Sequence, residues 1–243
     1  MGNNISADFF PPNEDNELLV YPIIDKIPEK KIYGWNRDIP DHRDKYYNHN
    51  NINNPICNYI DLRYNCPGIY NQKELGSCVS NNVIFLFEFN EILNNDAYVF
   101  KPSILFTYYN ERKNQNTIDY DSGSSIRNCI KMINKIGICE DTLWEYDTTK
   151  FNKKPHRLCY SESKIYKPIE YYKLNQNIID LKTCLNNGFP FILGISVYES
   201  FESENFNKTK IIPLPNKNEK LLGGHVIAIV GYDDNYGFIM RNS

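Results

Sequence analysis

The sequence of 243 residues lacks a strong excess of charge of either sign, since 27 basic and 30 acidic side chains leave a net charge of −3. It also lacks an apolar run long enough to span a bilayer, and no basic start followed by an apolar stretch opens the chain. The charge balance gives no electrostatic reason to bind nucleic acid or an anionic membrane. We therefore expect no nucleic-acid partner, no transmembrane segment and no signal peptide, and a location in the cytoplasm or in a virus particle.

One short motif at the N-terminus indicates a different link to membranes. The residues Met1-Gly2-Asn3-Asn4-Ile5-Ser6 fit the pattern for N-myristoylation, which would place a weak acyl anchor on Gly2. The pattern has poor specificity, and a plain polar start explains the same residues. Gly2 is thus a candidate modification site only.

Cysteine is present seven times, but the spacings that build metal sites are missing. No Cys-x-x-Cys occurs, and no spacing fits a familiar zinc pattern, so we expect neither a metal nor a cofactor. The odd number leaves at least one thiol outside any intrachain pairing. Most of the other cysteines are expected to be small buried apolar residues in reduced form.

The pattern of apolar residues predicts an α+β chain behind an irregular N-terminal arm. Residues 1–58 are rich in Asn, Asp, Pro and Tyr and show no sustained period, which is typical of an extended or propeptide-like arm. Helical spacing then predicts three helices, near 78–93, 103–112 and 125–136, the first with Ser77 as its N-cap. Alternation predicts strands over 189–198, 225–232 and 236–242, and the last two flank a turn at 233–235 and form a hairpin.

The hairpin has a geometric consequence for two polar residues. If the turn is centred between Asp233 and Asp234, His225 and Asn242 lie opposite or nearly opposite each other across the two strands. An asparagine in that place can accept the ring N–H of the histidine and fix its tautomer. A slip of one residue would put the two side chains on opposite faces.

Four residues together point to nucleophilic catalysis. Cys78 stands at the start of the first predicted helix, where the helix dipole favours a thiolate. His225 would serve as its acid and base and Asn242 would orient the imidazole. The side chain of Gln72 and the backbone N–H of Cys78 would donate to an oxyanion. A buried structural thiol and a strand-start histidine are the alternatives for each residue alone, but the combination favours a cysteine-nucleophile fold.

These residues stand in three blocks that resemble the signature blocks of the papain-like cysteine peptidases. The blocks are Gln72 to Cys78, Gly224-His225 and Asn242-Ser243, and Gly223-Gly224-His225-Val-Ile-Ala-Ile is most similar to the cathepsin B branch. The resemblance covers about residues 59–243. It implies a helical left lobe over about 59–165, an antiparallel β right lobe over about 166–243, and an active cleft between the two lobes.

The resemblance also implies an activity and the roles of the site residues. The chain would be an endopeptidase that hydrolyses polypeptides through a Cys78 thioester, with catalytic residues Cys78, His225, Asn242 and Gln72. A wall with Gly123 and Ser124 would pair with substrate backbone, and the other substrate-binding residues would be Gly76, Ser77 and Gly224. The inserted loop with paired histidines that supports cathepsin B-type exopeptidase action is missing, since only His156 lies between Cys78 and His225.

Departures from the family keep other readings open. Leu75 replaces the cysteine three positions before the nucleophile, so the disulfide it would form is not expected. The sequence ends at Asn242-Ser243, where the family continues with Trp-Gly, so the alternative function is a catalytically impaired domain with a binding or structural role, for instance in a virus particle. An acyltransferase is a third reading. The arm carries enough apolar residues to pack on the body, where it would cover either the cleft or the right lobe.

Overall fold

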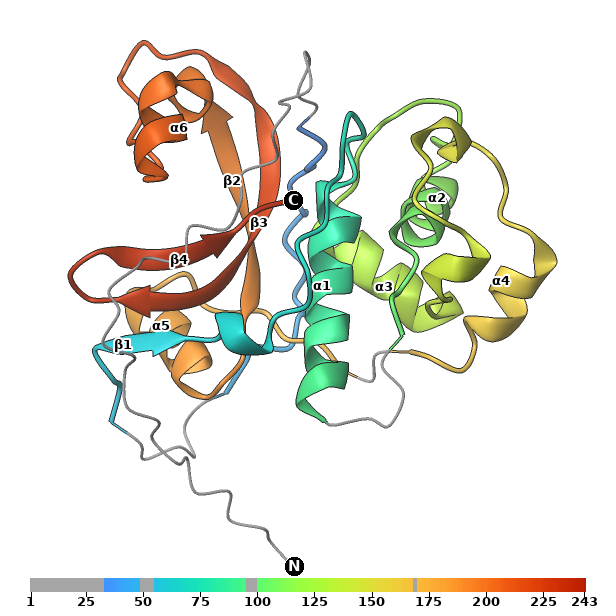
Figure 1. Ribbon diagram of the computed structural model, residues 1–243, viewed down its shortest axis with the longest axis horizontal. Coiled ribbons are helices and arrows are strands. Elements are labelled where there is room, and N and C mark those ends of the chain that lie inside the picture. Colours follow the sequence, from blue (N-terminus) through green and yellow to red (C-terminus); the bar gives the residue numbers. More distant parts are fainter. Residues whose placement is uncertain (1–32, 49–54, 95–99, 168–169) are drawn as a thin grey trace, which may run out of the picture.

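The computed structural model describes residues 33–48, 55–94, 100–167 and 170–243 and shows two lobes side by side (Figure 1). One lobe is built from helices and the other around an antiparallel sheet, as the sequence predicts. The first 32 residues, with the candidate modification site at Gly2, lie outside the described residues. Within the described part of the chain, no helix is both long enough and apolar enough to cross a membrane.

Helix α1 (Cys78–Leu93) forms the inner wall of the helical lobe, and α2 (Ile104–Asn114) and α3 (Ile126–Ile136) pack against it. The hydroxyls of Ser103 and Ser125 accept from backbone N–H groups in the first turns of α2 and α3, so both helices begin at capped serines. The lobe also contains α4 (Arg157–Glu162). Three short 3-10 turns belong to it as well, Arg63–Asn65, Asp141–Leu143 and Thr148–Lys150.

The other lobe is organised around β3 (Leu221–Asp233), which pairs antiparallel with every other strand of the sheet. Its strand partners are β1 (Tyr59–Asp61), β2 (Phe191–Tyr198) and β4 (Gly237–Arg241). The flanking elements are α5 (Ile178–Asn186), α6 (Glu204–Thr209) and a 3-10 turn (Glu199–Glu202). The sequence analysis assigned residues 59–165 to the helical lobe. The first three of them form β1 and pair with β3, so they belong to the sheet.

The register of the β3–β4 hairpin corrects the sequence prediction. Arg241 pairs with Ala228, and a bulge interrupts the ladder between Ile229 and Gly231, so Asn242 is displaced by two residues from the pairing predicted with His225. An even displacement keeps both side chains on the same face of the sheet. Diagonal neighbours on one face are also within reach of polar side chains. The expected contact therefore survives an incorrect register.

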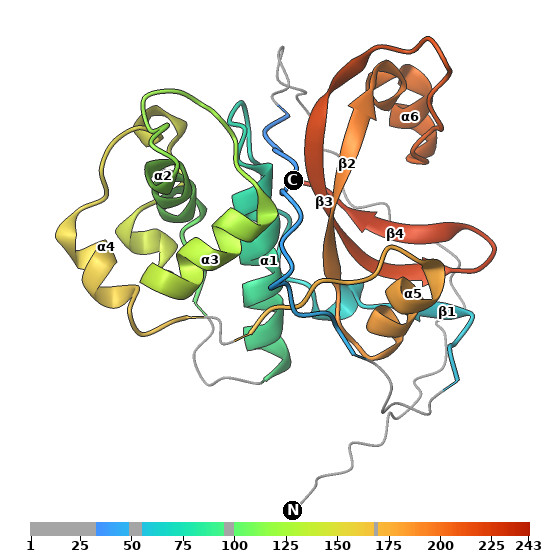
Figure 2. The same ribbon diagram turned by 180° about the vertical axis from the view of Figure 1, so that it is seen from behind.

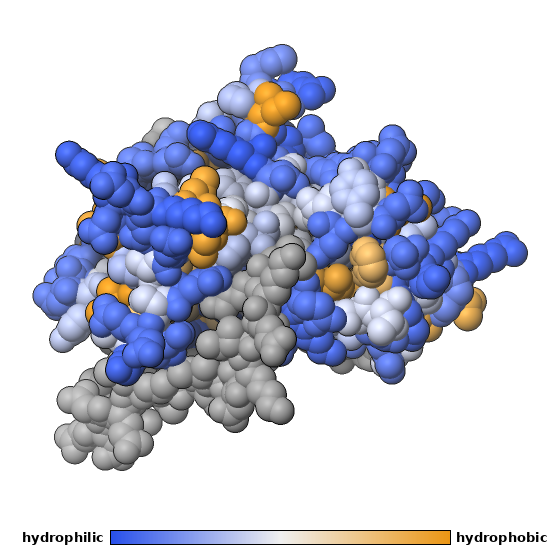
Figure 3. Space-filling view, turned by 90° about the horizontal axis from the view of Figure 1, so that it is seen from above, coloured by the Kyte–Doolittle hydropathy of each residue, from blue (hydrophilic) through white to orange (hydrophobic). Residues whose placement is uncertain are grey.

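The two lobes share an apolar interface along α1. Phe85 and Phe89 of the helix pack with Ala228 and Val230 of β3, and all four side chains are buried. Seen from above, the surface is mainly hydrophilic, and its apolar side chains form small separate groups over both lobes (Figure 3). The contact between α1 and β3 therefore buries apolar side chains of both lobes.

The arm runs between the lobes, as both ribbon views show (Figures 1 and 2). Residues 33–36 pair with both walls of the gap, through parallel bridges from Gly34 to Gly224 and from Trp35 to Ser124. Further along, the backbone of Tyr47 pairs with Lys173. The described part of the arm is thus held by both lobes along its length.

Candidate active site

Cys78 is the first residue of α1, and its side chain is completely buried. Burial raises the pKa of the Cys78 thiol to about 11, although hydrogen bonds from the backbone N–H groups of Val226 and Gly34 act in the opposite direction. At neutral pH the thiol is therefore protonated in this state. Since Gly34 belongs to the arm, the arm lies directly on the candidate nucleophile.

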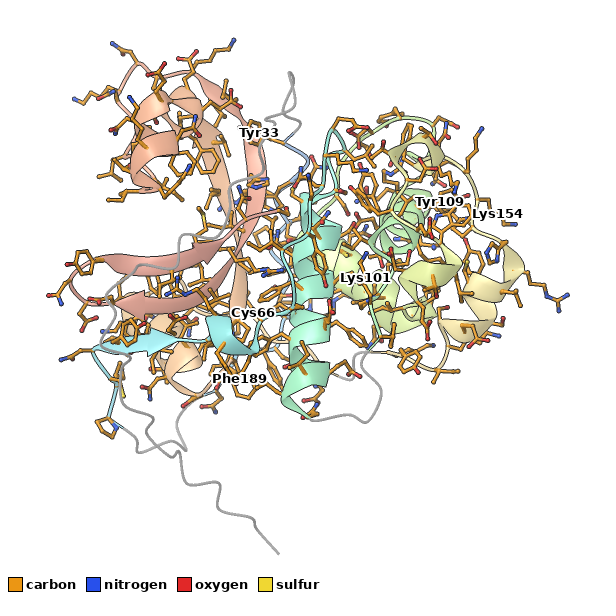
Figure 4. All side chains as sticks on the ribbon, viewed as in Figure 1. Tyr33, Cys66, Lys101, Tyr109, Lys154 and Phe189 are labelled. Atoms are coloured by element: carbon orange, nitrogen blue, oxygen red, sulfur yellow. The ribbon has the colours of Figure 1, made fainter. Side chains whose placement is uncertain are left out.

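His225 lies on β3 beside Val226, and its ring is oriented by Asn242. The two side chains meet with 2.7 Å between Nε2 of the histidine and Oδ1 of the asparagine. An amide oxygen can only accept, so Nε2 carries the proton. The rings of Tyr33 and Phe201 pack edge-on to the imidazole, with centroids 5.7 and 6.4 Å away. Figure 4 shows Tyr33, the first described residue of the arm, beside the sheet.

The loop before α1 carries Gln72, the predicted oxyanion donor, in a buried position. Its Nε2 donates to the carbonyl of Leu75 over 3.0 Å, and its Oε1 accepts from the hydroxyl of Ser243 over 2.8 Å. The phenol of Tyr146 donates to the Gln72 carbonyl over 2.9 Å and lies 2.6 Å from the Ser77 hydroxyl. Because Ser243 and Asn242 are consecutive, one short segment contacts both the imidazole and the loop of the oxyanion donor.

Asn82 connects the nucleophile's helix to the strand of the candidate base. This buried side chain donates through Nδ2 to the carbonyl of Cys78 over 2.9 Å and to the carbonyl of Val226 over 2.8 Å. One amide group therefore fixes the spacing of the two lobes next to both Cys78 and His225.

Four of the five predicted substrate-binding residues contact the arm. Gly76 faces Gly34, since a Cβ built on Gly34 would stand 1.9 Å from the Gly76 carbonyl oxygen. Ser124 donates to the Gly34 carbonyl and accepts from Asn36, and the carbonyl of Gly224 accepts from Trp35, over 2.8, 2.8 and 2.9 Å. Gly123 packs on the Gly34 carbonyl. The fifth residue, Ser77, is buried and directs its hydroxyl to Tyr146.

The rest of the described arm is fastened to α3 by charged groups. The guanidinium of Arg127 binds both carboxylate oxygens of Asp44, over 2.8 and 2.5 Å, and the backbone N–H of Arg127 donates to Asp38 over 3.1 Å. The hydrogen bonds from Arg127 hold the pKa of the Asp44 carboxyl below its usual value. The ion pair is formed at neutral pH and keeps the arm in place beside the cleft.

Comparison with known proteins identifies the family. The cysteine protease xylellain of Xylella fastidiosa is 37% identical to this chain and superposes with a TM-score of 0.77, over 90% of this chain and 86% of xylellain. The chain belongs to the papain-like cysteine peptidases. Its predicted α+β papain-like fold is confirmed by this match. No family model matches the chain.

A viral protein is also similar to this papain-like peptidase. An uncharacterised peptidase C1-like protein of Acanthamoeba polyphaga mimivirus is 40% identical over 181 residues, which is 71% of this chain. The chain spans 58% of the length of that relative.

The predicted placement near cathepsin B is not supported. The proCathepsin B of Trypanosoma congolense shares 15% identity with this chain and superposes with a TM-score of 0.57, which shows a common fold alone. The Gly223-Gly224-His225 block is thus too short a match to assign a branch, because it reports the local space around the imidazole.

The sequence analysis missed Asn82 altogether and named Ser243 only as part of the Asn242-Ser243 block. Their roles could not be predicted from local patterns, since each side chain contacts a group far away in the chain. Gly34 and Trp35 stand in the arm, where the pattern gave no register against the cleft. The Gly-Trp pair itself was visible, but only the fold places it on Cys78.

Proposed function

We propose that this papain-like chain is a cysteine endopeptidase that hydrolyses peptide bonds in polypeptides through a thioester on Cys78. The observation that carries the proposal is the hydrogen bond between His225 and Asn242, 2.7 Å long, on the strand whose next N–H group bonds the Cys78 sulfur. A thiol at a helix start, an imidazole beside it and an amide that orients the ring are the groups this chemistry needs.

The reaction follows from those groups. The imidazole of His225 takes the proton of the Cys78 thiol, and the sulfur attacks the carbonyl carbon of the peptide bond. The backbone N–H of Cys78 and the amide of Gln72 are suited to donate to the oxyanion. The imidazolium then gives its proton to the leaving amine, and a thioester remains. Water attacks that thioester with His225 as base, which releases the carboxylic acid and restores the thiol.

We further propose that the arm inhibits this activity. Its Gly34 bonds the sulfur and the Ser124 wall, so a polypeptide substrate and the arm compete for the same groups. The state with the arm bound is then a zymogen-like resting form, in which Cys78 is covered and protonated.

An open variant tests both statements. In Gly34→Val the new side chain collides with the Gly76 backbone, so the arm is expected to leave the cleft. We expect this variant to be labelled on Cys78 by an epoxide inhibitor of papain-like enzymes and to cleave peptides, and the wild type to do both far more slowly. Gly68→Val is the matched control, since a Cβ on Gly68 meets nothing within 4 Å.

The loss of Cys78 provides the second control. Gly34→Val with Cys78→Ala should lose at least about 10³-fold in turnover, since the nucleophile is part of a unit. Retained turnover in that double variant would rule out Cys78 as the nucleophile.

The second candidate is a catalytically impaired domain with a binding role. Complete burial of Cys78 beneath the arm is the observation that favours it. Failure of Cys78 to react with the epoxide in the open, folded variant would support this candidate over the peptidase. If Cys78 reacts and the acyl half of the peptide is recovered joined to an added amine and not as a free carboxylic acid, the chain is an acyltransferase.

A further inference from the structure

The backbone just before the candidate nucleophile is held by a carboxylate from a distant loop. Asp121 accepts the N–H of Gly76 through Oδ2, over 2.9 Å, and accepts the phenol O–H of Tyr108 through Oδ1. Gly76 lies two residues before Cys78, whereas Asp121 lies 45 positions further along the chain, between α2 and α3. One carboxylate therefore joins the loop of Cys78 to the loop that leads into the Gly123 wall.

The phenol of Tyr108 extends this connection to the wall itself. Tyr108 stands on α2 and is completely buried, and its hydroxyl accepts the N–H of Gly123 over 3.3 Å. Burial, and after it the charge of Asp121, raises the pKa of Tyr108, so the phenol keeps its proton and donates it to the carboxylate. The pair thus fixes the backbone of Gly76 relative to that of Gly123.

A buried cation supports the pair from below. The guanidinium of Arg112 lies 4.2 Å from the centroid of the Tyr108 ring and donates to the carbonyls of Ile118 and Tyr120, over 3.1 and 3.0 Å. These carbonyls belong to the segment directly before Asp121. Because a buried charge is costly without its hydrogen bonds, Arg112 holds that segment in one arrangement.

No disulfide does this work, because all seven cysteines are free. Leu75 stands where the resemblance places a cysteine, and it packs against Tyr108 in a buried apolar cluster. The loop before Cys78 is therefore held to α2 by an apolar contact and to Asp121 by a hydrogen bond.

The hydrogen bond at Asp121 also bears on Gln72, the expected oxyanion donor. Nε2 of Gln72 donates to the carbonyl of Leu75 over 3.0 Å, and the N–H of the next residue, Gly76, is the group bound by Asp121. That carbonyl and that N–H belong to one planar peptide unit, so neither turns without the other. An amide nitrogen has two N–H groups, so the bond to Leu75 sets the direction of the second one.

We propose that Asp121 is a positioning residue, which with Tyr108 holds the Leu75–Gly76 peptide unit and so aligns the oxyanion donors of Gln72 and Cys78. The proposal rests on the peptidase activity proposed above. Loss of an oxyanion donor costs about 10²- to 10³-fold in kcat. A donor that is present but misaligned should therefore cost about 10- to 100-fold.

The first test compares two reactions of the same thiol in the full chain with Gly34→Val. A peptide aldehyde adds to the Cys78 sulfur and places its carbonyl oxygen where the oxyanion forms, whereas iodoacetamide alkylates the sulfur and forms no oxyanion. With Asp121→Asn, aldehyde affinity and kcat should fall about 10- to 100-fold. The alkylation rate and KM should stay nearly the same. Asp119→Asn is the matched control, because it removes the same charge from an exposed position of the same loop.

Tyr108→Phe provides a milder second variant, which serves if Asp121→Asn fails to fold. It removes the phenol donor and should lower aldehyde affinity in the same direction. Combined with Asp121→Asn, it should add little, because the two side chains act as one unit. Unchanged aldehyde affinity in the folded variants, or an equal loss in aldehyde affinity and alkylation rate, would overturn the positioning role.

A measurement on the resting protein separates this proposal from the peptidase activity. Hydrogen bonds to a carboxylate are short and strong, so the amide proton of Gly76 should resonate downfield in full-length protein with isotope-labelled glycine. It should move upfield in Asp121→Asn and stay in place in Asp119→Asn. That shift, together with aldehyde binding that depends on Asp121 but no peptide turnover, would support the positioning role and reject the peptidase. A Gly76 signal that ignores Asp121→Asn would reject the positioning role, whatever the turnover.

Discussion

At the residue scale, the protonation state of Cys78 depends on the arm. Burial is the main reason that the pKa of its thiol is raised to about 11, and the arm supplies part of that burial. When the arm leaves, water returns, and the start of α1 and the nearby imidazole favour the thiolate. The nucleophile should therefore be strengthened by the same step that uncovers it.

The first prediction concerns the pH dependence of alkylation. In the wild type, Cys78 should react with iodoacetamide only as the pH rises toward 11, because the neutral thiol persists below its raised pKa. In Gly34→Val the reaction should begin several pH units lower. Mass spectrometry of the modified peptide at each pH provides the measurement. Identical profiles for the two proteins would show that the arm does not control the thiol.

The second prediction concerns Asn82, which holds the lobes together beside the site. Asn82→Ala in the open variant should lower kcat about 10- to 100-fold and leave KM nearly unchanged, because the loss of two buried hydrogen bonds frees the Cys78–His225 spacing. The pH–rate profile should also narrow or shift, which a purely structural role would not cause. Asn90→Ala, at an exposed position of α1, is the control. An unchanged profile would refute the positioning role.

Single residues also show what sequence can and cannot tell. Cys78 was expected at a helix start, where the structure has it, and His225 at a strand start, whereas β3 begins four residues earlier, at Leu221. Asn242 was assigned as His225's partner from a wrong register, and the contact survived because the error was even. Two contacts were not predictable because they join distant parts of the chain. Ser243 bonds Gln72 across 171 positions, and Asn82 bonds Val226 of the other lobe across 144 positions.

At the scale of elements, helices were easier to predict than strand pairing. The capping serines Ser103 and Ser125 and the C-terminal Gly137 bound α2 and α3 close to the predicted limits, because caps are local signals. The hairpin bulge between Ile229 and Gly231 is not local, since it depends on how β3 curves between its partners. Ser77 is at the predicted N-cap position of α1, but its hydroxyl bonds Tyr146 and does not cap the helix.

The third prediction concerns the fastening of the arm to α3. Arg127→Ala removes the paired hydrogen bonds to Asp44, so the arm should leave more often and peptidase activity should rise about 3- to 30-fold. Lys131→Ala is the control, because the Lys131 ammonium is 3.6 Å from Asp41 and half exposed. Equal activity of the Arg127 variant, this control and the wild type would show that the ion pair does not hold the arm.

Acid should act on the same fastening. Arg127 lowers the pKa of Asp44 most, and the charge of Lys173 lowers it by a smaller amount. The negative charge of Asp41 acts in the opposite direction, but the pKa stays below its usual value. The pair is therefore intact above the usual carboxyl pKa and is lost as the pH falls through the lowered one. Brief acid treatment of the wild type, followed by the epoxide label, should increase the modification of Cys78, and in Arg127→Ala it should add little.

At the scale of the whole molecule, the described part of the arm behaves as a third component between two lobes. It meets the helical lobe at Ser124 and Arg127, strand β3 of the other lobe at Gly224, and Lys173 through an isolated bridge outside the sheet. Of the two locations expected from the sequence, the described residues favour the cleft. The arm therefore adds contact area to both lobes and lies where the proposed inhibition requires it.

The fourth prediction separates those two contributions. Removal of residues 1–50 should raise peptide turnover and epoxide labelling, because the cleft is emptied. It should also lower the melting temperature by several degrees, since buried contacts to both lobes are lost. Turnover and calorimetry on the same preparation measure the two effects. A deletion that changes neither quantity would refute both roles of the arm.

The seating of Gly34 against Gly76 and Gly123 has a genetic consequence. Every missense change at codon 34 adds at least a Cβ, and a Cβ there stands 1.9 Å from a backbone oxygen. Under the proposed inhibition by the arm, each amino-acid replacement at position 34 should therefore raise the activity. A saturation library selected for proteolysis should be enriched at that codon for all replacements, and for large side chains above all.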